Sequence, residues 1–514
     1  MRTQSLTFDE PIHIAEGLDA LRNHRFQDWN DHPPLARLWC ALPLFANSEY
    51  LINALPLLGP EGKISDFSPD PQAIAVRARS MILVFGLILG LLIWKTARRM
   101  FSSAAANLAL ALFVFSPALV AHSSLATTDC IAALIIFATA AVLLWWRKRP
   151  TLARTAAFGL VLGLLLLAKF STPPMFVLAL GWMLVLQPEW LRLNPLRWNW
   201  GKMVMALLIA SFVVWAGYFF HVSHLQIQDG MLTATFPNRT PFEHKVNFQH
   251  LKLSMPLPAG EYFQGLWRVA QDNKMGHAAF FLGRISKRGG FKLYYPATVL
   301  LKWPVMVLLL FAVSCGLLLA HKIRVPAGLW VMLSFPAVYF AMAIFAHFNI
   351  GDRHILPVYP FVLLVACGVW EAAVMRGWAR KLMVAAVLLA AIDSLRSGPD
   401  YLSFFNVYVR PSEAYRLLTD SNLDWGQGLL ALRDYESAHP KDEISLAYFG
   451  SVDPRAYGIK ARLLGPGEHA RGMVIVSATN LSGQYLDDPQ SYRWVLEYPQ
   501  VGIVNGNMYV FKVP

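Results

Sequence analysis

The sequence predicts a multi-span α-helical membrane protein with a small C-terminal α/β domain on the extracytoplasmic side, and three observations carry that prediction. Of the 514 residues, 56% are hydrophobic and only 15% are charged, whereas soluble domains average about 45–50% apolar and about 25% charged residues. The apolar residues gather in about ten runs that approach the length needed to cross a bilayer as a helix. The residues after 395 have a soluble composition instead.

The apolar runs define the expected transmembrane domain, residues 76–395. Soluble proteins with buried hairpins seldom string so many apolar runs together, so we favour the membrane interpretation. Lys169, Pro173 and Pro174 separate two short runs, which leaves the span count open between 153 and 187. The runs are 76–94, 104–121, 129–146, 153–168, 172–187, 202–220, 298–320, 325–346, 355–375 and 380–395.

The distribution of basic residues predicts the orientation. They follow alternate spans, as the positive-inside rule requires of cytoplasmic connections, so the net charge of +13 needs no nucleic-acid partner. We therefore expect a multi-pass protein of the cell inner membrane whose segments 1–75, 221–297 and 396–514 face outwards. The basic connections hold Lys95, Arg98, Arg99, Arg147, Lys148, Arg149, Arg154, Arg192, Arg197, Lys202, Lys322, Arg324, Arg376, Arg380 and Lys381.

The outer segments differ in their expected structure. The first holds two amphipathic stretches, 10–23 and 33–45, and the loop 221–297 is rich in Pro, Gly and aromatic residues. The tail combines helix-like segments with short strand-like runs, which predicts an α/β domain. Its helix-like segments are 412–418 and 427–437, and its strand-like runs are Ile444–Phe449, Met473–Ser477 and Met508–Val513.

Cysteine chemistry is not expected. The four cysteines, Cys40, Cys130, Cys315 and Cys367, show neither CxxC nor Cys/His spacing, so neither a disulfide framework nor a thiolate metal site is supported.

Two acidic positions are candidates for catalysis. Asp9 and Glu10 are adjacent acids in the first outer segment, and we expect Asp9 to be catalytic and Glu10 to bind substrate. Alternatively, they mark an ordinary helix N-terminus, which favours acids. Asp129 stands at the outer end of a span. An acid at membrane depth costs several kcal/mol unless it is paired or hydrated, and so marks a functional site by default; the alternative is a helix cap at the interface.

Three cationic motifs are candidates for binding an anion. Asp31 and His32 precede two prolines, which can start a helix and so place both residues at an N-terminus suited to anions; a simple helix start is the alternative. Lys169 ends an apolar run, where snorkelling to the interface is the alternative. Arg353, followed by His354, can bind a phosphate bidentately, or it serves as an interface anchor or pairs with Asp352.

These motifs are weak one by one, but the charge rules assign them all to one membrane face. That face is where a lipid phosphate head group lies. An enzyme acting there needs a carboxylate base to deprotonate an acceptor hydroxyl and cations to stabilise a departing phosphate. Asp9 or Asp129 can supply the base, and His32, Lys169 and Arg353 the cations.

The same motifs resemble bacterial members of glycosyltransferase family 39, the protein O-mannosyltransferase-like and aminoarabinose-transferase-like enzymes of the GT-C fold. The resemblance covers nearly the whole chain. The motifs that carry it are Asp9-Glu10-x-x-His13, His32-Pro33-Pro34-Leu35, Ala126-Thr127-Thr128-Asp129, Leu167-Ala168-Lys169-Phe170-Ser171, Arg353-His354-Ile355-Leu356-Pro357-Val358-Tyr359-Pro360 and Asp420-Ser421-Asn422-Leu423-Asp424-Trp425-Gly426-Gln427.

The resemblance implies transfer of a sugar from a polyprenyl-phosphate carrier to an acceptor on the outer side of the membrane, with inversion of the anomeric carbon. It implies that Asp9 is the base and that Asp129 orders the site or binds the acceptor. It also implies that His32 and Arg353 meet the carrier phosphate. His32 replaces the Lys of aminoarabinose enzymes, which places the chain on the mannosyltransferase-like side.

The sequence differs from the family pattern at its N-terminus. The family has a transmembrane helix before its Asp-Glu pair, whereas this chain begins almost at that pair, and we expect a late start assignment to explain this. Neither the sugar, the acceptor nor the oligomeric state is indicated. No metal ligand is assigned, although some GT-C enzymes use a divalent cation.

Two other functions stay open at this point. A lipid flippase or transporter should show inverted repeats and polar groups at the bilayer midplane, and the sequence shows no repeat. A non-catalytic subunit of an envelope assembly would use the tail as a binding module. The observation that discriminates is whether Asp9 and Asp129 face one cavity, with Arg353 or Lys169 in reach of both.

Overall fold

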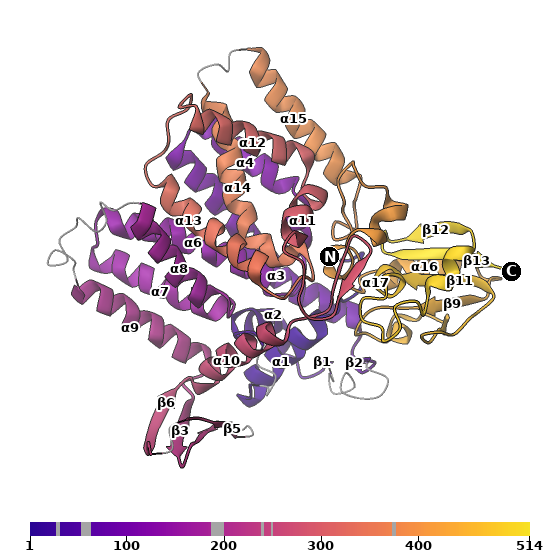
Figure 1. Ribbon diagram of the computed structural model, residues 1–514, viewed down its shortest axis with the longest axis horizontal. Coiled ribbons are helices and arrows are strands. Elements are labelled where there is room, and N and C mark those ends of the chain that lie inside the picture. Colours follow the sequence, from indigo (N-terminus) through magenta and orange to yellow (C-terminus); the bar gives the residue numbers. More distant parts are fainter. Residues whose placement is uncertain (27–30, 53–62, 187–199, 238–240, 248–249, 373–376) are drawn as a thin grey trace.

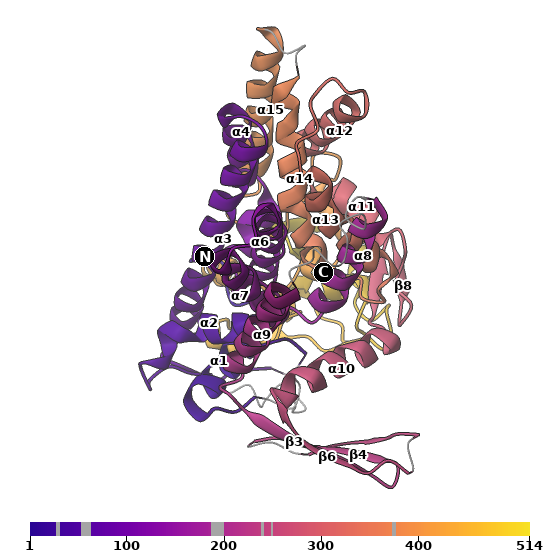
Figure 2. The same ribbon diagram turned by 90° about the vertical axis from the view of Figure 1, so that its left-hand side faces the viewer.

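A computed structural model describes residues 1–26, 31–52, 63–186, 200–237, 241–247, 250–372 and 377–514. Helices form one large body, and the chain ends in a separate sheet at its side (Figure 1). A second, smaller sheet projects from the base of the helical body (Figure 2). The predicted class, a helical membrane protein with a C-terminal α/β domain, is confirmed.

The first outer segment forms the two predicted amphipathic helices, α1 (Glu10–Asn23) and α2 (Leu35–Phe45). They pack closely because Gly17 has no side chain. A Cβ at that position would lie 2.1 Å from the carbonyl oxygen of Arg37. Two short antiparallel strands, β1 (Leu51–Ile52) and β2 (Phe67–Ser68), follow.

Within the described residues, each predicted apolar run lies mainly on helix. The helices of the body are α3 (Pro71–Met100), α4 (Ser103–Val114), α5 (Pro117–His122), α6 (Asp129–Lys148), α7 (Leu152–Ala168), α8 (Thr172–Leu186), α9 (Trp200–Gly217), α11 (Tyr294–Lys302), α12 (Val305–Leu319), α13 (Leu329–Phe345), η4 (Asp352–Val358), α14 (Tyr359–Ala366), η5 (Cys367–Glu371) and α15 (Trp378–Leu395).

The expected number of spans is higher than the number of helices that meet a strict length criterion. Within the described residues, four helices are long and apolar enough to cross a membrane, or five if α11 and α12 count as one span bent by 112°. Prolines explain part of the difference, because Pro117 separates α4 from α5 and Pro304 separates α11 from α12. The other short helices have 15–17 residues, about 23–26 Å at 1.5 Å per residue.

Multiple apolar helices are thus confirmed, whereas the orientation stays a prediction. Of the basic residues on which that prediction rests, Arg192, Arg197 and Arg376 lie outside the described residues.

The loop 221–297 contains structure that the sequence analysis did not predict. Its strands form an antiparallel sheet in the order β5-β4-β3-β6, followed by an amphipathic helix and a hairpin. Pro and Gly had indicated irregular loop, but they lie mainly at the ends of these strands. The elements are β3 (Val222–Gln228), β4 (Met231–Thr235), β5 (Phe242–Lys245), β6 (Leu253–Pro258), α10 (Gly260–Met275), β7 (Ala279–Phe281) and β8 (Arg284–Ser286).

The tail forms a mixed sheet in the order β10-β9-β11-β13-β12. β9 pairs in parallel with β10 and β11, and β13 pairs antiparallel with β11 and β12. The predicted strands correspond to β9, β11 and β13. The elements are η6 (Pro411–Arg416), η7 (Asp420–Asn422), α16 (Leu429–Ala438), β9 (Ile444–Ala447), η8 (Pro454–Tyr457), β10 (Arg462–Leu463), β11 (Gly472–Ser477), α17 (Ala478–Ser482), η9 (Arg493–Glu497), β12 (Gln500–Val504) and β13 (Met508–Val513).

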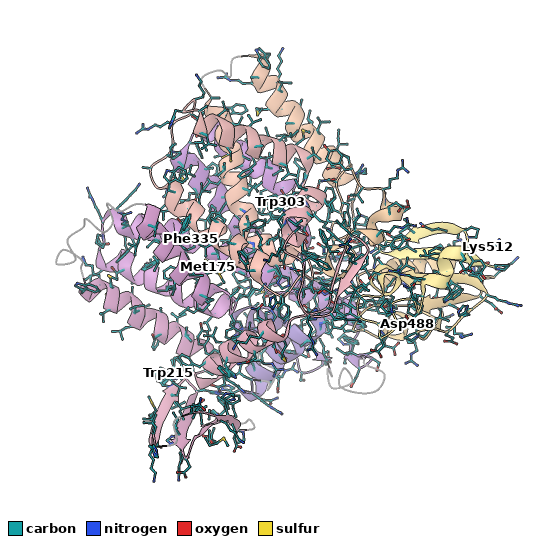
Figure 3. All side chains as sticks on the ribbon, in the orientation of Figure 1. Met175, Trp215, Trp303, Phe335, Asp488 and Lys512 are labelled. Carbon is teal, nitrogen blue, oxygen red and sulfur yellow. The ribbon has the colours of Figure 1, made fainter. Side chains whose placement is uncertain are left out.

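One apolar core runs from the helices into the tail domain. Met175, Trp303 and Phe335 are buried within the helical body, whereas Asp488 and Lys512 are exposed on the tail domain (Figure 3). Because apolar contacts are continuous between the two parts, the sheet is held against the helices rather than tethered by a linker.

Candidate active site

Arg353 lies at the centre of the candidate site, between two carboxylates that are far away in the sequence. Its Nη1 is 2.9 Å from Oδ2 of Asp9 and 3.9 Å from Oδ2 of Asp129. Lys169 Nζ donates a 2.7 Å hydrogen bond to Oδ1 of Asp129. These four side chains form one ionic cluster, so the structure brings together two acids and two cations that the sequence analysis had selected separately.

Helix ends place the four residues. Asp129 begins α6 and Lys169 follows α7. Because a short connection makes these helices antiparallel neighbours, the start of one and the end of the other lie at one level. Asp9 directly precedes α1, and Arg353 is the second residue of η4. Acids at the first turn of a helix are also favoured by its dipole.

Exposure separates the two carboxylates of the cluster. The Asp129 side chain is fully buried, whereas 25% of the Asp9 side chain is exposed. A bound substrate can therefore reach Asp9 more readily than Asp129. Among the described residues, Oδ2 of Asp129 and Nε2 of His354 are buried without a hydrogen-bond partner. Buried polar atoms are normally satisfied, so these two atoms are candidates for bonding to a ligand.

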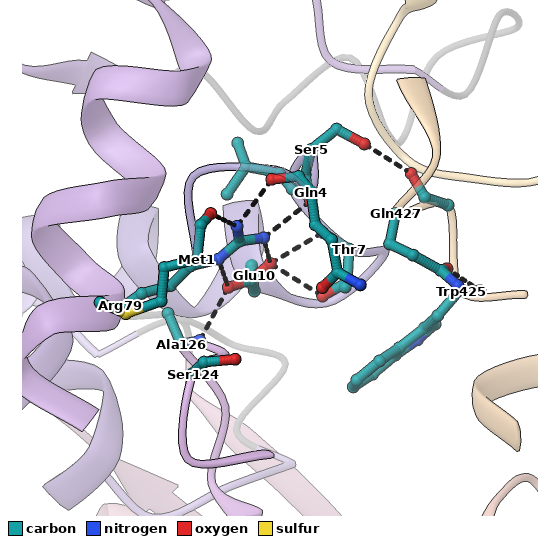
Figure 4. A network of polar contacts seen from close by, with 12 residues as sticks. Met1, Gln4, Ser5, Thr7, Glu10, Arg79, Ser124, Ala126, Trp425 and Gln427 are labelled. Atoms are coloured by element: carbon teal, nitrogen blue, oxygen red, sulfur yellow. Dashed lines mark hydrogen bonds and ion pairs between the residues drawn. The ribbon is translucent and has the colours of Figure 1, made fainter. Parts of the chain in front are cut away.

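Glu10 plays a different part from its neighbour. Its carboxylate accepts hydrogen bonds from Nε and Nη2 of Arg79 at 2.7 and 2.6 Å (Figure 4). It also accepts hydrogen bonds from the backbone N–H groups of Ala126 and Thr7 at 2.7 and 2.8 Å. Burial acts to raise the pKa of Glu10, but Arg79 and the N–H donors outweigh it and lower this pKa below its usual value. Glu10 thus ties the Asp9 loop to α3 and to the turn before Asp129, which favours a positioning role over the predicted contact with substrate.

Asp31 and His32 lie beside the cluster in a second polar group. Arg37 Nη2 donates a 2.5 Å hydrogen bond to Asp31, and Nδ1 of His32 is 3.2 Å from the same carboxylate. The His32 ring packs edge-on to His13 at 5.2 Å between centroids. Burial, together with Arg37, lowers the pKa of His13 well below its usual value, so His13 is a neutral ring at pH 7.

Electrostatic interactions connect this second group to the cluster. His354 lies close enough to Lys169, Asp129 and His32 to feel their charges. The sequence-predicted cations therefore surround one region, from the start of α2 to the start of η4.

Several residues of the site were missed by sequence reasoning. Ser421 Oγ accepts a 3.0 Å hydrogen bond from Nε of Arg353, and the guanidinium carbon lies 4.2 Å from the centroid of the Trp425 ring. Both belong to the tail motif 420–427, which the sequence analysis used only as part of the family resemblance and not as part of the site. Arg79 did leave a signal, because an ionisable residue inside an apolar run is itself unusual. Arg37 left none.

Metal ligands are not assigned by the structure. Within the described part of the chain, no group of three or more His, Cys, Asp or Glu side chains is placed to hold a metal ion.

The structure thus places two acids and two cations in one largely buried cluster at helix ends. Residues 73–215 match the family model described as dolichyl-phosphate-mannose-protein mannosyltransferase, PMT_2. This segment runs from the first turn of α3 to the last turn of α9 and contains Asp129 and Lys169. The match covers less than half of the chain, and over this segment it confirms the resemblance to mannosyltransferase-like enzymes.

Comparisons with solved structures give more distant similarities. ArnT from Cupriavidus metallidurans bound to undecaprenyl phosphate is 12% identical, with a TM-score of 0.49 over 99% of this chain and 94% of that chain. ArnT from the same organism in the apo state is 13% identical, with a TM-score of 0.45 over the same shares. No curated protein matches this chain.

Proposed function

We propose that this chain transfers a sugar from a polyprenyl-phosphate carrier to an acceptor hydroxyl at the extracytoplasmic face of the membrane. The observation that supports the proposal most strongly is the cluster in which Arg353 contacts Asp9 and lies 3.9 Å from Asp129, while Lys169 holds Asp129. The family match over residues 73–215 supports the choice of donor class.

Asp9 is the proposed base. Its carboxylate accepts the proton of the acceptor hydroxyl as the hydroxyl oxygen forms a bond to the anomeric carbon. The bond between that carbon and the phosphate oxygen breaks, and its electron pair leaves with the phosphate. A single displacement of this kind inverts the configuration at the anomeric carbon.

Arg353 and Lys169 are the proposed ligands of the departing phosphate. Charge builds on the phosphate oxygens in the transition state, and fixed cations in a site of low dielectric stabilise it without having to reorganise. Asp129 holds Lys169 in place and limits the net positive charge. His32 and His354 border the same region and are proposed to contact the carrier phosphate or the sugar.

The test is to incubate purified protein with polyprenyl-phosphate sugars, with and without candidate acceptors, and to measure release of the polyprenyl phosphate. We expect release that depends on the sugar donor and is lost in Asp9→Asn. A flippase would move the carrier across the bilayer without breaking the sugar–phosphate bond, so transport without release would contradict the proposal.

A further inference from the structure

One segment of the tail domain, residues 420–427, contacts Arg353 directly and bonds to the chain next to Asp9. The segment joins the region after η6 to α16 and includes η7. Asp9 and Arg353 are 344 positions apart in the chain, yet each has neighbours that bond to this segment.

On the Arg353 side, the segment holds both the side chain and the backbone. Ser421 Oγ accepts a 3.0 Å hydrogen bond from Nε of Arg353, and the Trp425 ring lies 4.2 Å from the guanidinium carbon. Asn422 Oδ1 accepts a 3.0 Å hydrogen bond from the backbone N–H of Asp352. A guanidinium that stacks on an indole and bonds through Nε keeps its plane fixed. Its terminal nitrogens are thereby directed towards the acids.

On the Asp9 side, the segment bonds to the chain that leads into the base. The N–H of Phe8 donates a 2.8 Å hydrogen bond to the carbonyl oxygen of Trp425, and the N–H of Ser5 donates a 3.0 Å hydrogen bond to that of Gln427. Figure 4 shows Gln427 next to Ser5, with Trp425 on the same segment beyond it. Trp425 therefore touches Arg353 with its ring and the Asp9 loop with its carbonyl group.

The segment is itself fixed by the C-terminal sheet. Asp424 accepts hydrogen bonds from the N–H of Thr479 at 3.0 Å and from Nδ2 of Asn507 at 2.8 Å. Thr479 follows β11 and Asn507 precedes β13. Gly426 has a φ of +83°, and a Cβ there would lie 2.7 Å from the hydroxyl of Tyr448, so the tight turn after Trp425 needs glycine.

We propose that the 420–427 segment is a positioning element of the active site, in which Trp425 sets the orientation of Arg353 relative to Asp9. The inference rests on the proposed function, because it assigns the tail domain to the same site. The tail is thus part of the transfer machinery and not a separate binding module. Trp425 acts through Arg353 and is a positioning residue, since its own ring is buried.

The test compares Trp425→Leu with Trp425→Phe and with a control, Trp494→Leu, which removes a half-buried indole elsewhere in the same domain. We expect Trp425→Leu to weaken binding of undecaprenyl phosphate, used as the probe, about tenfold and to slow transfer, because the cation–π contact is lost. Trp425→Phe keeps a ring and should stay within about threefold of wild type. The control should lower thermal stability without changing the affinity for the probe.

A second measurement does not depend on catalysis. The fluorescence of wild type minus that of Trp425→Phe isolates the Trp425 emission, which should change in Arg353→Ala. Unchanged emission, or a Trp425→Leu variant that binds the probe and transfers sugar as wild type does, would overturn the positioning role. If wild type shows no transfer but the emission does change, the proposed function fails while the contact stands.

Discussion

Asp9 and Glu10 are neighbours in sequence, and each pairs with an arginine, but the two pairs differ in how completely the protein satisfies them. All five N–H donors of Arg79 are used: two on Glu10 and three on the carbonyl groups of Met1, Gln4 and Ser5. Neither side chain of that pair is exposed.

The pair next to it is open. Asp9 is partly exposed, and within the described residues Asp129 keeps one carboxylate oxygen without a hydrogen bond. A buried ion pair is favourable only when its remaining donors and acceptors are satisfied. The closed pair, Glu10–Arg79, therefore stabilises the structure. The open pair, Asp9–Arg353, keeps hydrogen-bonding capacity for a ligand. Adjacent acids of the same chemical type thus take different roles through their partners.

The largest expected effect is on catalysis at the open pair. Asp9→Asn keeps the size of the side chain but removes the base, so transfer should fall about 10²- to 10⁴-fold. Thermal unfolding of the detergent-purified protein should change little, because this side chain is partly exposed. Transfer is measured as release of carrier from a polyprenyl-phosphate sugar, and activity near that of wild type would remove Asp9 as the base.

The next effect is on stability at the closed pair. Glu10→Gln leaves the Arg79 guanidinium buried without a charge partner, which costs about 3–5 kcal/mol. We expect a lower midpoint of thermal unfolding and a low yield of folded protein. The double variant Glu10→Gln with Arg79→Met removes the orphan charge and should recover part of the loss. A Glu10→Gln variant as stable as wild type would show that the closed pair is not structural.

A smaller effect concerns buried carboxylates whose hydrogen-bond donors are neutral. Burial raises the pKa of both Asp400 and Asp424 to about 6. A raised carboxyl pKa means that the folded state binds the proton more tightly, so this contribution to stability is present below about pH 4 and is lost as the pH rises to about 6. Glu10 has the opposite sign, because its lowered pKa gives stability that is lost as the pH falls below about 4.5.

Asp424→Asn tests whether the raised pKa of Asp424 makes the folded state less stable as the pH rises. The variant has no carboxyl to titrate, so the thermal midpoint should fall less between pH 4 and 6 than it does in wild type. Thermal midpoints measured across that range in one detergent give the comparison. An identical slope in both proteins would contradict the assignment of the titration to Asp424.

Some features of the site and the fold could be predicted from the sequence, and others could not. The positions of Asp129 and Lys169 followed from apolar runs, because a charged residue at the end of such a run is readable without a structure. The strands at Ile444 and Met508 followed from local patterns in the same way. In contrast, pairing of Glu10 with Arg79 depends on how α1 packs on α3, which no local pattern encodes.

Tertiary contacts also decided what was missed. Trp425 reaches Arg353 only because the tail sheet packs on the helical body, and nothing in its local sequence indicates this. Several helices are shorter than the predicted runs because prolines break apolar runs that hydropathy alone treats as continuous. The sheet at 222–258 was missed because its turns are rich in Pro and Gly.

The most direct test of the open cluster is the affinity of the protein for undecaprenyl phosphate without sugar or acceptor. Arg353→Ala should weaken binding about 10- to 100-fold, since hydrogen bonds to charged groups contribute about 1.5–3 kcal/mol. Arg416→Ala is the matched control, because Arg416 is an exposed arginine of the tail domain that pairs with Glu413. We predict wild-type affinity in the control and the loss in Arg353→Ala; equal affinity in both variants would contradict a phosphate site at Arg353.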